Sequence, residues 1–587
     1  MKGQRILYAA ANFLIRAMLA AIVFLVFLHS IYSTSFIGRS VHPDGTVYGK
    51  TFNIPDSPWR HVLLFVLATA VCITVRRVWH KLEVDRRLPG LVRQHAVEWL
   101  SILFIAVCTV WIAVTQLKPG SDPAKVYDVM MQWRAGDFSA FEKENYLFCY
   151  PFQSGIILFY YLLSFLFGEK SYIGLQAVNV VSLAAVYWLL ASLARSFWKE
   201  DGRIPALVYL AQMLWVPLFF YITYIYGILP GMACSVGAIY LAVRYLERRK
   251  FRYMAGASLC IGLATVLKMN CLIYLVAIAC FMVYDAVDTL LAGKRNRTPG
   301  RNWLASLGFV ALMGIGVWGC NGLTGLAVER LSGYEMPEGE VMLSWVAMGL
   351  QEAPKGPGDY NGYIGEVFTD SNYDSQVATE MSLTEIRKIL TGMIENPLDV
   401  GLPFFARKTA YQWNDPTFIS MERMEGRKSA GKMPAVVRSI IDGRGSVILS
   451  VALNYVQTFL LAGVLLYLFL NRKSRSLTEL MVAVVFLGGY LFHTFWEAGS
   501  SYTIPYFALI IPYAVKGFRD WVRLADDAVR ERKIPFAFDR KTVLTVAGGA
   551  LILTLFIVFR TTNLFDRTIA LDDGADAVEQ YYNRGDW

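Results

Sequence analysis

Residues 98–117, EWLSILFIAVCTVWIAVTQL, run directly into Lys118-Pro-Gly-Ser-Asp122-Pro123. This apolar run has about the 20 residues that a helix needs to cross the hydrocarbon core of a bilayer. The polar stretch after it carries a carboxylate, that of Asp122, just where the helix would leave the membrane. The sequence therefore predicts a membrane helix that ends at an aqueous surface beside an acidic side chain.

Similar apolar runs recur along the whole chain of 587 residues, which is 55% apolar and 17% charged, with a mean hydropathy of +0.41. The apolar fraction is higher and the charged fraction lower than in soluble globular proteins, so we expect an all-α polytopic membrane protein of about 13 transmembrane helices. Spans are predicted near residues 13–35, 60–79, 98–117, 172–194, 204–222, 227–246, 253–267, 270–287, 303–326, 446–470, 477–496, 502–516 and 542–560.

The net charge of +10 comes from Lys and Arg clusters between apolar runs, which is typical of cytoplasmic loops and argues against nucleic-acid binding. These clusters are Arg76 to Arg87, Arg248 to Lys250, Lys294 to Arg297, Arg472 to Arg475 and Lys516 to Arg523. All of these clusters lie on the same side of the membrane only if the short apolar run at residues 151–167 does not cross the membrane. We therefore expect a juxtamembrane helix there, a cytoplasmic N-terminus, and a C-terminus outside the plasma membrane.

This topology divides the chain into four segments. Two N-terminal helices and a basic loop form residues 1–97, and a transmembrane module with a first outer loop at 118–152 forms residues 98–326. A long outer loop follows at 327–445. C-terminal helices and a short outer tail form residues 446–587.

Within the first outer loop, residues 123–135 place Val126, Val129, Met130 and Trp133 on one face of a helix, which predicts an amphipathic surface helix. Asp before Pro at a helix start is also a common N-cap, so Asp122 has a purely structural alternative.

The loop continues through Gly136-Asp137-Phe138 to Tyr150-Pro-Phe-Gln153. Together with Asp122, these motifs resemble the first outer loop of GT-C superfamily membrane glycosyltransferases, in particular bacterial relatives of the protein O-mannosyltransferases. The resemblance covers roughly residues 98 to 515. It implies that the expected all-α polytopic membrane fold is GT-C-like, that Asp122 has a catalytic role, and that Tyr150 and Gln153 bind substrate.

The chain departs from that pattern in two places. Many relatives have an Asp-Glu pair where this chain has Asp122-Pro123, and many have His at the position of Phe152. The next acid, Asp128, would lie on another face of the helix.

The predicted chemistry follows from the topology. The chain has no cytoplasmic stretch long enough for a nucleotide-binding domain, so a sugar used outside has to arrive on a lipid. With a polyprenyl-phosphate sugar as donor, the leaving group is already an anion, and one carboxylate can suffice as general base for the acceptor hydroxyl. We expect the sugar transfer to invert the anomeric configuration and to take place at the outer face, in contact with membrane lipid. We expect no cofactor, and no spacing of His, Cys and acidic residues predicts a metal site.

Cations are needed to hold the donor phosphate. Lys268 lies between two apolar runs on the predicted outer side, although snorkelling to the interface is an equal alternative. Arg407 and Lys408 lie in an aromatic and basic stretch of the long loop, where an interfacial anchor is the alternative.

Further substrate-binding candidates are polar and aromatic residues of the outer loops: Trp345, Asp359, Asn361, Glu497 and Tyr502. Gly358 to Tyr363 is also ordinary turn chemistry, and an acid and a Tyr at an interface are often anchors. Relatives usually have Arg before the Tyr, where this chain has Ser501.

Two other functions stay open. A transporter or lipid flippase would suit the many helices, but it would place charges deep inside the spans and have small outer loops. A ligase or polymerase of lipid-linked polysaccharide would use a diphosphate donor, and the acidic first loop argues against it.

Overall fold

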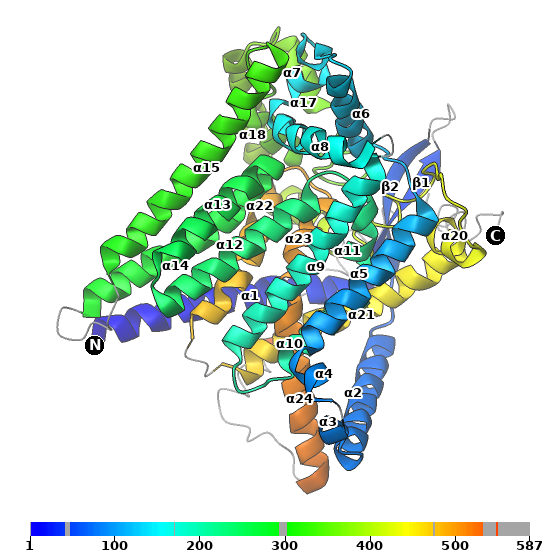
Figure 1. The fold of residues 1–587 in the computed structure, drawn as a ribbon, viewed down its shortest axis with the longest axis vertical. Helices are drawn as coiled ribbons and strands as arrows, with labels where there is room; N and C mark the ends of the chain where they lie inside the picture. The colour runs from blue at the N-terminus through cyan, green and yellow to red at the C-terminus, as the bar shows by residue number, and fades with distance from the viewer. Residues whose placement is uncertain are drawn as a thin grey trace.

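The computed structural model describes residues 2–41, 47–87, 89–168, 171–292, 302–472, 476–531 and 548–549. Within these residues, helices make up nearly all of the regular structure, together with one antiparallel β-hairpin (Figure 1). The predicted class, an all-α polytopic membrane protein, is confirmed in that the described helices include many that could span a bilayer.

Nine helices of the described chain are long and apolar enough to cross a membrane. They are α1 (Lys2–Tyr32), α2 (Pro58–Lys81), α5 (Ala96–Thr115), α9 (Ser171–Phe197), α12 (Ile228–Arg248), α14 (Leu272–Ala292) with the short η5 (Met269–Cys271), α15 (Trp303–Ser332), α21 (Arg444–Leu470), and α22 (Met481–Phe495) with η8 (Thr478–Leu480).

Other predicted spans take different forms. The run near 204–222 is bent by 61° between α10 (Ile204–Leu214) and the segment Pro217–Thr223, which contains α11 (Pro217–Phe220) and η4 (Tyr221–Thr223). The run near 253–267 is the shorter α13 (Phe251–Leu267), and the run near 502–516 is divided between α23 (Ser500–Ala508) and α24 (Ile511–Glu531). The span near 542–560 and the C-terminal tail lie almost entirely outside the described residues. The total of about 13 and the four-segment division stay predictions.

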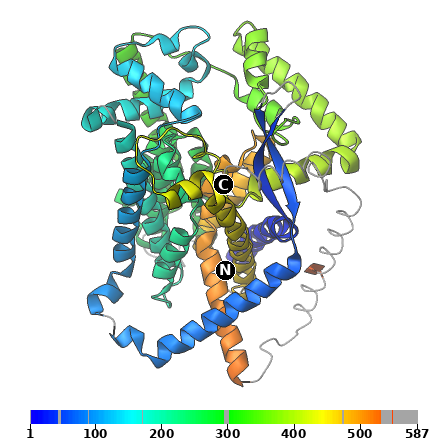
Figure 2. The same cartoon turned by 90° about the vertical axis from the view of Figure 1, so that its right-hand side faces the viewer.

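Most short helices of the two predicted outer loops, together with the predicted juxtamembrane segment, gather at the upper end of the molecule in Figures 1 and 2, whereas the helix at residues 435–442 lies lower. The first loop contains α6 (Asp122–Arg134), η1 (Ser139–Phe141), α7 (Tyr146–Cys149) and η2 (Pro151–Gln153), and the juxtamembrane segment after it forms α8 (Ser154–Phe167). The long loop contains α16 (Met342–Gly349), α17 (Tyr363–Asp370), α18 (Ser375–Glu395), η7 (Pro397–Gly401), α19 (Leu402–Trp413) and α20 (Ala435–Asp442).

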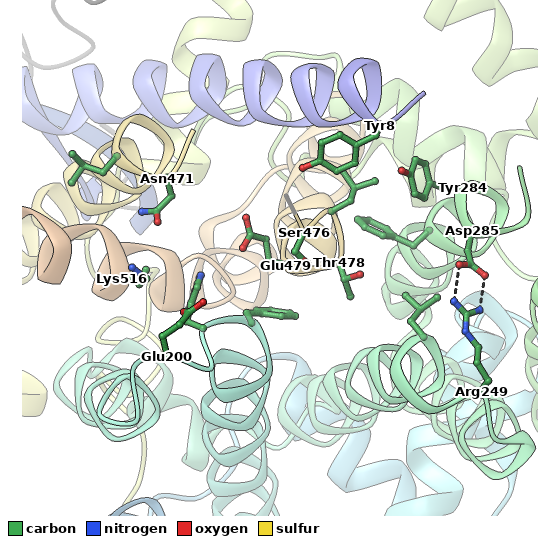
Figure 3. A pocket seen from close by; sticks show the side chains of 16 residues that line it. Tyr8, Glu200, Arg249, Tyr284, Asp285, Asn471, Ser476, Thr478, Glu479 and Lys516 are labelled. Atoms are coloured by element: carbon green, nitrogen blue, oxygen red, sulfur yellow. Dashed lines mark hydrogen bonds and ion pairs between the residues drawn. The ribbon is translucent and has the colours of Figure 1, made fainter. Parts of the chain in front are cut away.

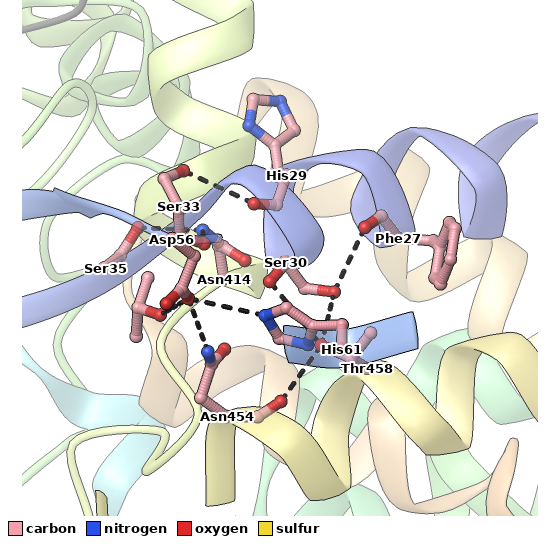
Figure 4. A network of polar contacts seen from close by, with 11 residues as sticks. Phe27, His29, Ser30, Ser33, Ser35, Asp56, His61, Asn414, Asn454 and Thr458 are labelled. Carbon is pink, nitrogen blue, oxygen red and sulfur yellow. Dashed lines mark hydrogen bonds and ion pairs between the residues drawn. The ribbon is translucent and has the colours of Figure 1, made fainter. Parts of the chain in front are cut away.

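The sequence did not predict the hairpin of β1 (Ser33–Val41) and β2 (Val47–Pro55), which pairs Ser33 with Pro55. Its base is fixed by a buried polar network (Figure 4). Asp56 accepts hydrogen bonds from Thr34 (2.5 Å) and from Asn454 of α21 (2.6 Å), and the His61 Nε2 lies 3.6 Å from the same carboxylate. The network joins the first two long helices to α21.

The short helices α3 (Val84–Arg87) and α4 (Gly90–Gln94) lie at the opposite end, the lower end in Figure 1, near several ion pairs of basic residues. Arg76 and Arg77 form ion pairs with Asp526 at 3.1 and 2.7 Å, and Arg523 pairs with Asp201 at 2.8 Å. Several residues predicted to be cytoplasmic thus lie together. The side of the membrane that this end faces is a prediction.

A cavity of about 940 Å³ opens at this basic end (Figure 3). It is lined by polar groups that include Glu200, Asn471 and Lys516, and by the ion pair of Arg249 with Asp285, at 2.6 and 2.8 Å. The cavity lies at the far end of α9 from the outer-loop helices.

Close helix packing depends on glycine, as is common in membrane proteins, where small residues let backbones approach. A Cβ added to Gly517 of α24 would overlap the Gly463 carbonyl oxygen of α21. A Cβ on Gly463 would lie 2.6 Å from the Ala514 carbonyl oxygen. The contact between α21 and α24 therefore has no room for a methyl group at either position.

We expect Gly517→Ala to lower the free energy of unfolding by about 1–3 kcal/mol, because the added methyl forces the two helices apart. Thermal unfolding in detergent, followed by tryptophan fluorescence, measures the effect. Gly314→Ala in α15 is the matched control, because nothing lies within 4 Å of its Cβ position. Equal midpoints for the two variants would contradict the packing argument.

Candidate active site

The end of α5 is paired with the returning end of the long loop. Leu117 and Ser429 form an isolated antiparallel bridge, with Lys118 N donating to the Lys428 carbonyl at 2.9 Å. The Arg427 guanidinium completes this contact. It donates to the carbonyl oxygens of Lys118 (2.7 Å), Leu117 (3.3 Å) and Thr223 (3.1 Å). We call this paired segment, residues 116–118 with 427–430, the strap.

Asp122 follows the strap as the first residue of α6. Its side chain is exposed and makes no hydrogen bond or ion pair with the described residues. Ser121 occupies the N-cap position, with a φ of 53° and no capping hydrogen bond from its side chain. The structural alternative, in which Asp122 caps the helix, is therefore not what the structure shows.

The amphipathic helix after Asp122 forms as predicted. Pro123, Val126, Val129, Met130 and Trp133 of α6 are buried. The last four share an apolar cluster with Ile156, Ile157 and Tyr160 of α8, so the stripe packs on α8. The helix α8 itself has 14 residues and ends at Gly168, which agrees with the expectation of a segment too short to cross.

Lys268 lies in the break between α13 and η5, where its extended backbone ends the helix. Its side chain is half-buried, and its Nζ lies 4.1 Å from the centre of the Tyr226 ring. The Tyr226 hydroxyl accepts a hydrogen bond from the Gln153 side chain at 2.8 Å. Gln153 of the first outer loop and Lys268, in the break after α13, thus both contact Tyr226, which lies just before α12.

Glu497 and Tyr502 also lie near Lys268. The Tyr502 hydroxyl donates to the Glu497 carboxylate at 3.1 Å, and the His493 ring stacks on the Tyr502 ring at 6.0 Å. Lys268 and Tyr502 both line a small pocket between α12, α14 and α23. One predicted substrate-binding residue, Tyr502, and one predicted phosphate ligand, Lys268, therefore border the same space, and Glu497 is hydrogen-bonded to Tyr502.

Lys268 and Glu497 both interact electrostatically with Asp122. Burial lowers the pKa of Lys268 to about 8, against the opposing effects of Asp122 and Glu497. Burial, together with the charges of Asp359 and Asp122, raises the pKa of Glu497 to about 8. At pH 7 this balance favours a neutral Glu497 beside a charged Lys268.

Three residues that the sequence analysis did not single out belong to this site. The Arg423 guanidinium lies 5.2 Å from the centre of the Tyr224 ring, and its Nε is buried without a hydrogen-bond partner. Asp122 acts electrostatically on Arg423, Tyr224 and Tyr226. The tyrosines could have been found, because they form a short aromatic turn between two predicted spans on the outer side. No local sequence pattern indicated that Arg423 belongs to the site.

The two other predicted phosphate ligands make different contacts. Arg407 forms a two-pronged ion pair with Glu352 at 2.5 and 3.2 Å. Lys408 is 1% exposed, and its ammonium donates to the carbonyl oxygens of Gly349 and, at 2.8 Å, Trp496. Burial lowers the pKa of Lys408 to about 7. These contacts connect α16 and α19 to the segment after α22 and do not bring either cation to Asp122.

The remaining candidates divide between a turn and an aromatic cluster. Asn361 donates to the Gln351 side chain at 2.8 Å and accepts from the Tyr363 backbone at 3.0 Å, the turn contacts that were the alternative. Asp359 accepts from the Tyr411 hydroxyl at 2.8 Å, and burial raises the pKa of Asp359. Tyr150 and Trp345 lie in the aromatic cluster described below.

In the described part of the chain, no group of three or more His, Cys, Asp and Glu side chains could hold a metal ion.

Comparisons with known proteins add little. No family model and no curated protein matches the chain. Among solved structures, it is similar to the crystal structure of the Archaeoglobus fulgidus oligosaccharyltransferase tethered with an acceptor peptide, with a TM-score of 0.36 and 14% identity. The alignment covers 84% of this chain and 59% of that chain, so this chain spans less than two thirds of the other protein. A likeness this weak carries no argument, and the described residues alone define a polytopic helical membrane protein with a charged site at its outer-loop end.

A glycine fixes the position of Lys268. Gly227 has a φ of 77°, and a Cβ there would overlap the Leu267 carbonyl oxygen, directly before Lys268. We expect Gly227→Ala to cost about 1–2 kcal/mol in backbone strain, with additional loss from the overlap, and to lower the thermal midpoint in detergent. The control is Gly365→Ala, whose Cβ position has nothing within 4 Å. A wild-type midpoint for Gly227→Ala would contradict this packing.

Proposed function

We propose that the protein is an inverting glycosyltransferase that moves a sugar from a polyprenyl-phosphate donor to an acceptor hydroxyl at the outer face of the membrane. The observation that carries this proposal is the free, exposed carboxylate of Asp122 at the exit of a membrane helix, in electrostatic contact with a half-buried lysine. The resemblance of residues 118–153 to GT-C enzymes supports it.

In the proposed reaction, Asp122 accepts the proton of the acceptor hydroxyl. The acceptor oxygen then bonds to the anomeric carbon from the face opposite the phosphate, and the bond between that carbon and the phosphate oxygen breaks. The leaving group is polyprenyl phosphate, whose developing charge Lys268 and Arg423 would stabilise. One bond forms as one breaks on the opposite face, so the configuration at the anomeric carbon inverts.

The structure changes the roles that we assign to the other predicted cations. Lys408 donates to two backbone carbonyl groups, so we propose that it positions the segment that carries Glu497. Arg407 is engaged by Glu352. Arg423, with a buried Nε free of partners, replaces them as the second proposed phosphate ligand.

We expect Asp122→Asn to reduce sugar transfer by about 10²- to 10⁴-fold, the range that a general base contributes, while expression and membrane insertion stay normal. Transfer from a labelled polyprenyl-phosphate sugar, assayed in detergent, measures this. Asp128→Asn is the matched control, because Asp128 is an exposed acid of the same helix. Full activity of Asp122→Asn would eliminate the proposed base.

The charges of the site predict a pH dependence of donor binding. As the pH rises through about 8, Lys268 loses its proton and Glu497 becomes an anion, so the site becomes less attractive for a phosphate. We expect the KM for the donor to rise above pH 8. Lys268→Arg should remove much of this rise, because a guanidinium stays protonated.

Lys125→Arg, on the exposed side of α6, serves as the control for that experiment and should keep the wild-type profile. A KM that does not change between pH 7 and pH 9 in the wild-type protein would argue against Lys268 as a phosphate ligand.

A further inference from the structure

An aromatic cluster lies beside the candidate active site and consists of Tyr150, Phe152, Trp345 and Trp496, whose rings contact one another, and of Tyr360, whose hydroxyl interacts with that of Tyr150. The Trp345 and Trp496 rings stack at 6.1 Å with an interplanar angle of 6°, and the Phe152 ring lies edge-on to Trp345 at 5.9 Å. Phe152 is 45% exposed and Tyr360 is 54% exposed. The cluster therefore presents two ring surfaces to its surroundings above a packed base.

A carboxyl group lies against this cluster. Glu340 is 8% exposed and interacts through its carboxyl group with the Tyr150 hydroxyl, while its Oε2 is buried and makes no hydrogen bond of normal geometry with the described residues. Its backbone N–H donates to the Cys149 carbonyl at 3.0 Å, which fixes Glu340 beside Tyr150. An unsatisfied buried polar atom costs free energy, and a ligand that hydrogen-bonds to it recovers that cost.

The base of the cluster is rigid. Lys408 connects the carbonyl groups of Gly349, at the end of α16, and Trp496. The backbone of Ala498 donates to the Gly358 carbonyl at 2.7 Å, next to the turn that carries Tyr360. Because three segments distant in sequence are held together here, the ring surfaces are fixed before any ligand binds.

The cluster adjoins Asp122. The Tyr150 ring packs on the Tyr146 ring at 5.3 Å, and Tyr146 interacts electrostatically with Asp122. Tyr360 interacts in the same way with Glu340, Glu497 and Asp122. A molecule bound on the cluster would thus reach from Glu340 toward the proposed base.

We propose that the aromatic cluster and Glu340 bind the acceptor, and that this acceptor is a carbohydrate. This inference rests on the proposed function. A sugar ring has an apolar C–H face, which packs on aromatic rings, and a rim of hydroxyls, which hydrogen-bond to carboxyl and phenol groups. The cluster offers both kinds of partner within one rigid unit. A hydroxyl of the bound ring would then face Asp122 for transfer.

The test is direct binding of saccharides to the purified full-length protein without donor, by isothermal titration calorimetry. The probes are linear hexasaccharides of mannose, of glucose and of N-acetylglucosamine, compared with a peptide rich in Ser and Thr. We expect at least one hexasaccharide to bind and the peptide not to bind. Phe152→Ala and Glu340→Ala should each weaken saccharide binding about tenfold, since each removes a direct contact.

Two further variants keep the test interpretable. Glu340→Gln keeps the size and hydrogen-bonding capacity of the side chain, so its affinity should stay within about threefold of wild type. Phe165→Ala removes an aromatic ring that is 58% exposed at the far end of α8, and it should bind like the wild type.

The inference would be overturned if both Phe152→Ala and Glu340→Ala kept the wild-type affinity for saccharide. It would also be overturned if the peptide bound and none of the hexasaccharides did. Thermal unfolding establishes that each variant is folded. Donor cleavage is assayed separately. Saccharide binding without any donor cleavage would contradict the proposed transferase and leave the carbohydrate site standing.

Discussion

The strap is the contact on which the candidate active site depends. It pairs the end of α5 with residues near the end of the long loop, and Arg427 supplies donors to three backbone carbonyl groups. An arginine is suited to this task because its planar group presents several donors at fixed angles. Without the strap, the short stretch from Gln116 to Ser121 would connect a membrane helix to α6 with little to define its path. With it, Asp122 starts α6 at a fixed place beside Arg423 and Tyr224.

A second constraint is the cost of burying charge. Lys268 and Glu497 are both partly buried. Asp122 and Glu497 stabilise the charged form of Lys268, and Lys268 stabilises the charged form of Glu497, whereas Asp359 and Asp122 disfavour it. Such a group of mutually dependent charges is sensitive to any change in one member. In the proposed function, this group offers the donor phosphate a cation, Lys268, that is flanked by the rings of Tyr226 and Tyr502.

Local patterns predicted much of the fold and part of the site. Apolar run length located most of the long helices, the stripe of α6 predicted its buried face, and charge clustering led to the short α8. Lys268 stood out because a charge between two apolar runs is rare. The sequence did not predict the strap, the β-hairpin or the place of Arg423 in the site, because each is defined by contacts between segments that are far apart in the sequence. For the same reason, the sequence could not show that Lys408 is buried against Gly349 and Trp496.

A density map of the protein with bound polyprenyl phosphate would show whether these residues form a donor site. We expect headgroup density in contact with Lys268 and Arg423, with the Asp122 carboxylate beside it and free of any protein partner. Headgroup density found only among the lipids around the helices, or an Asp122 carboxylate locked in an ion pair, would contradict this expectation.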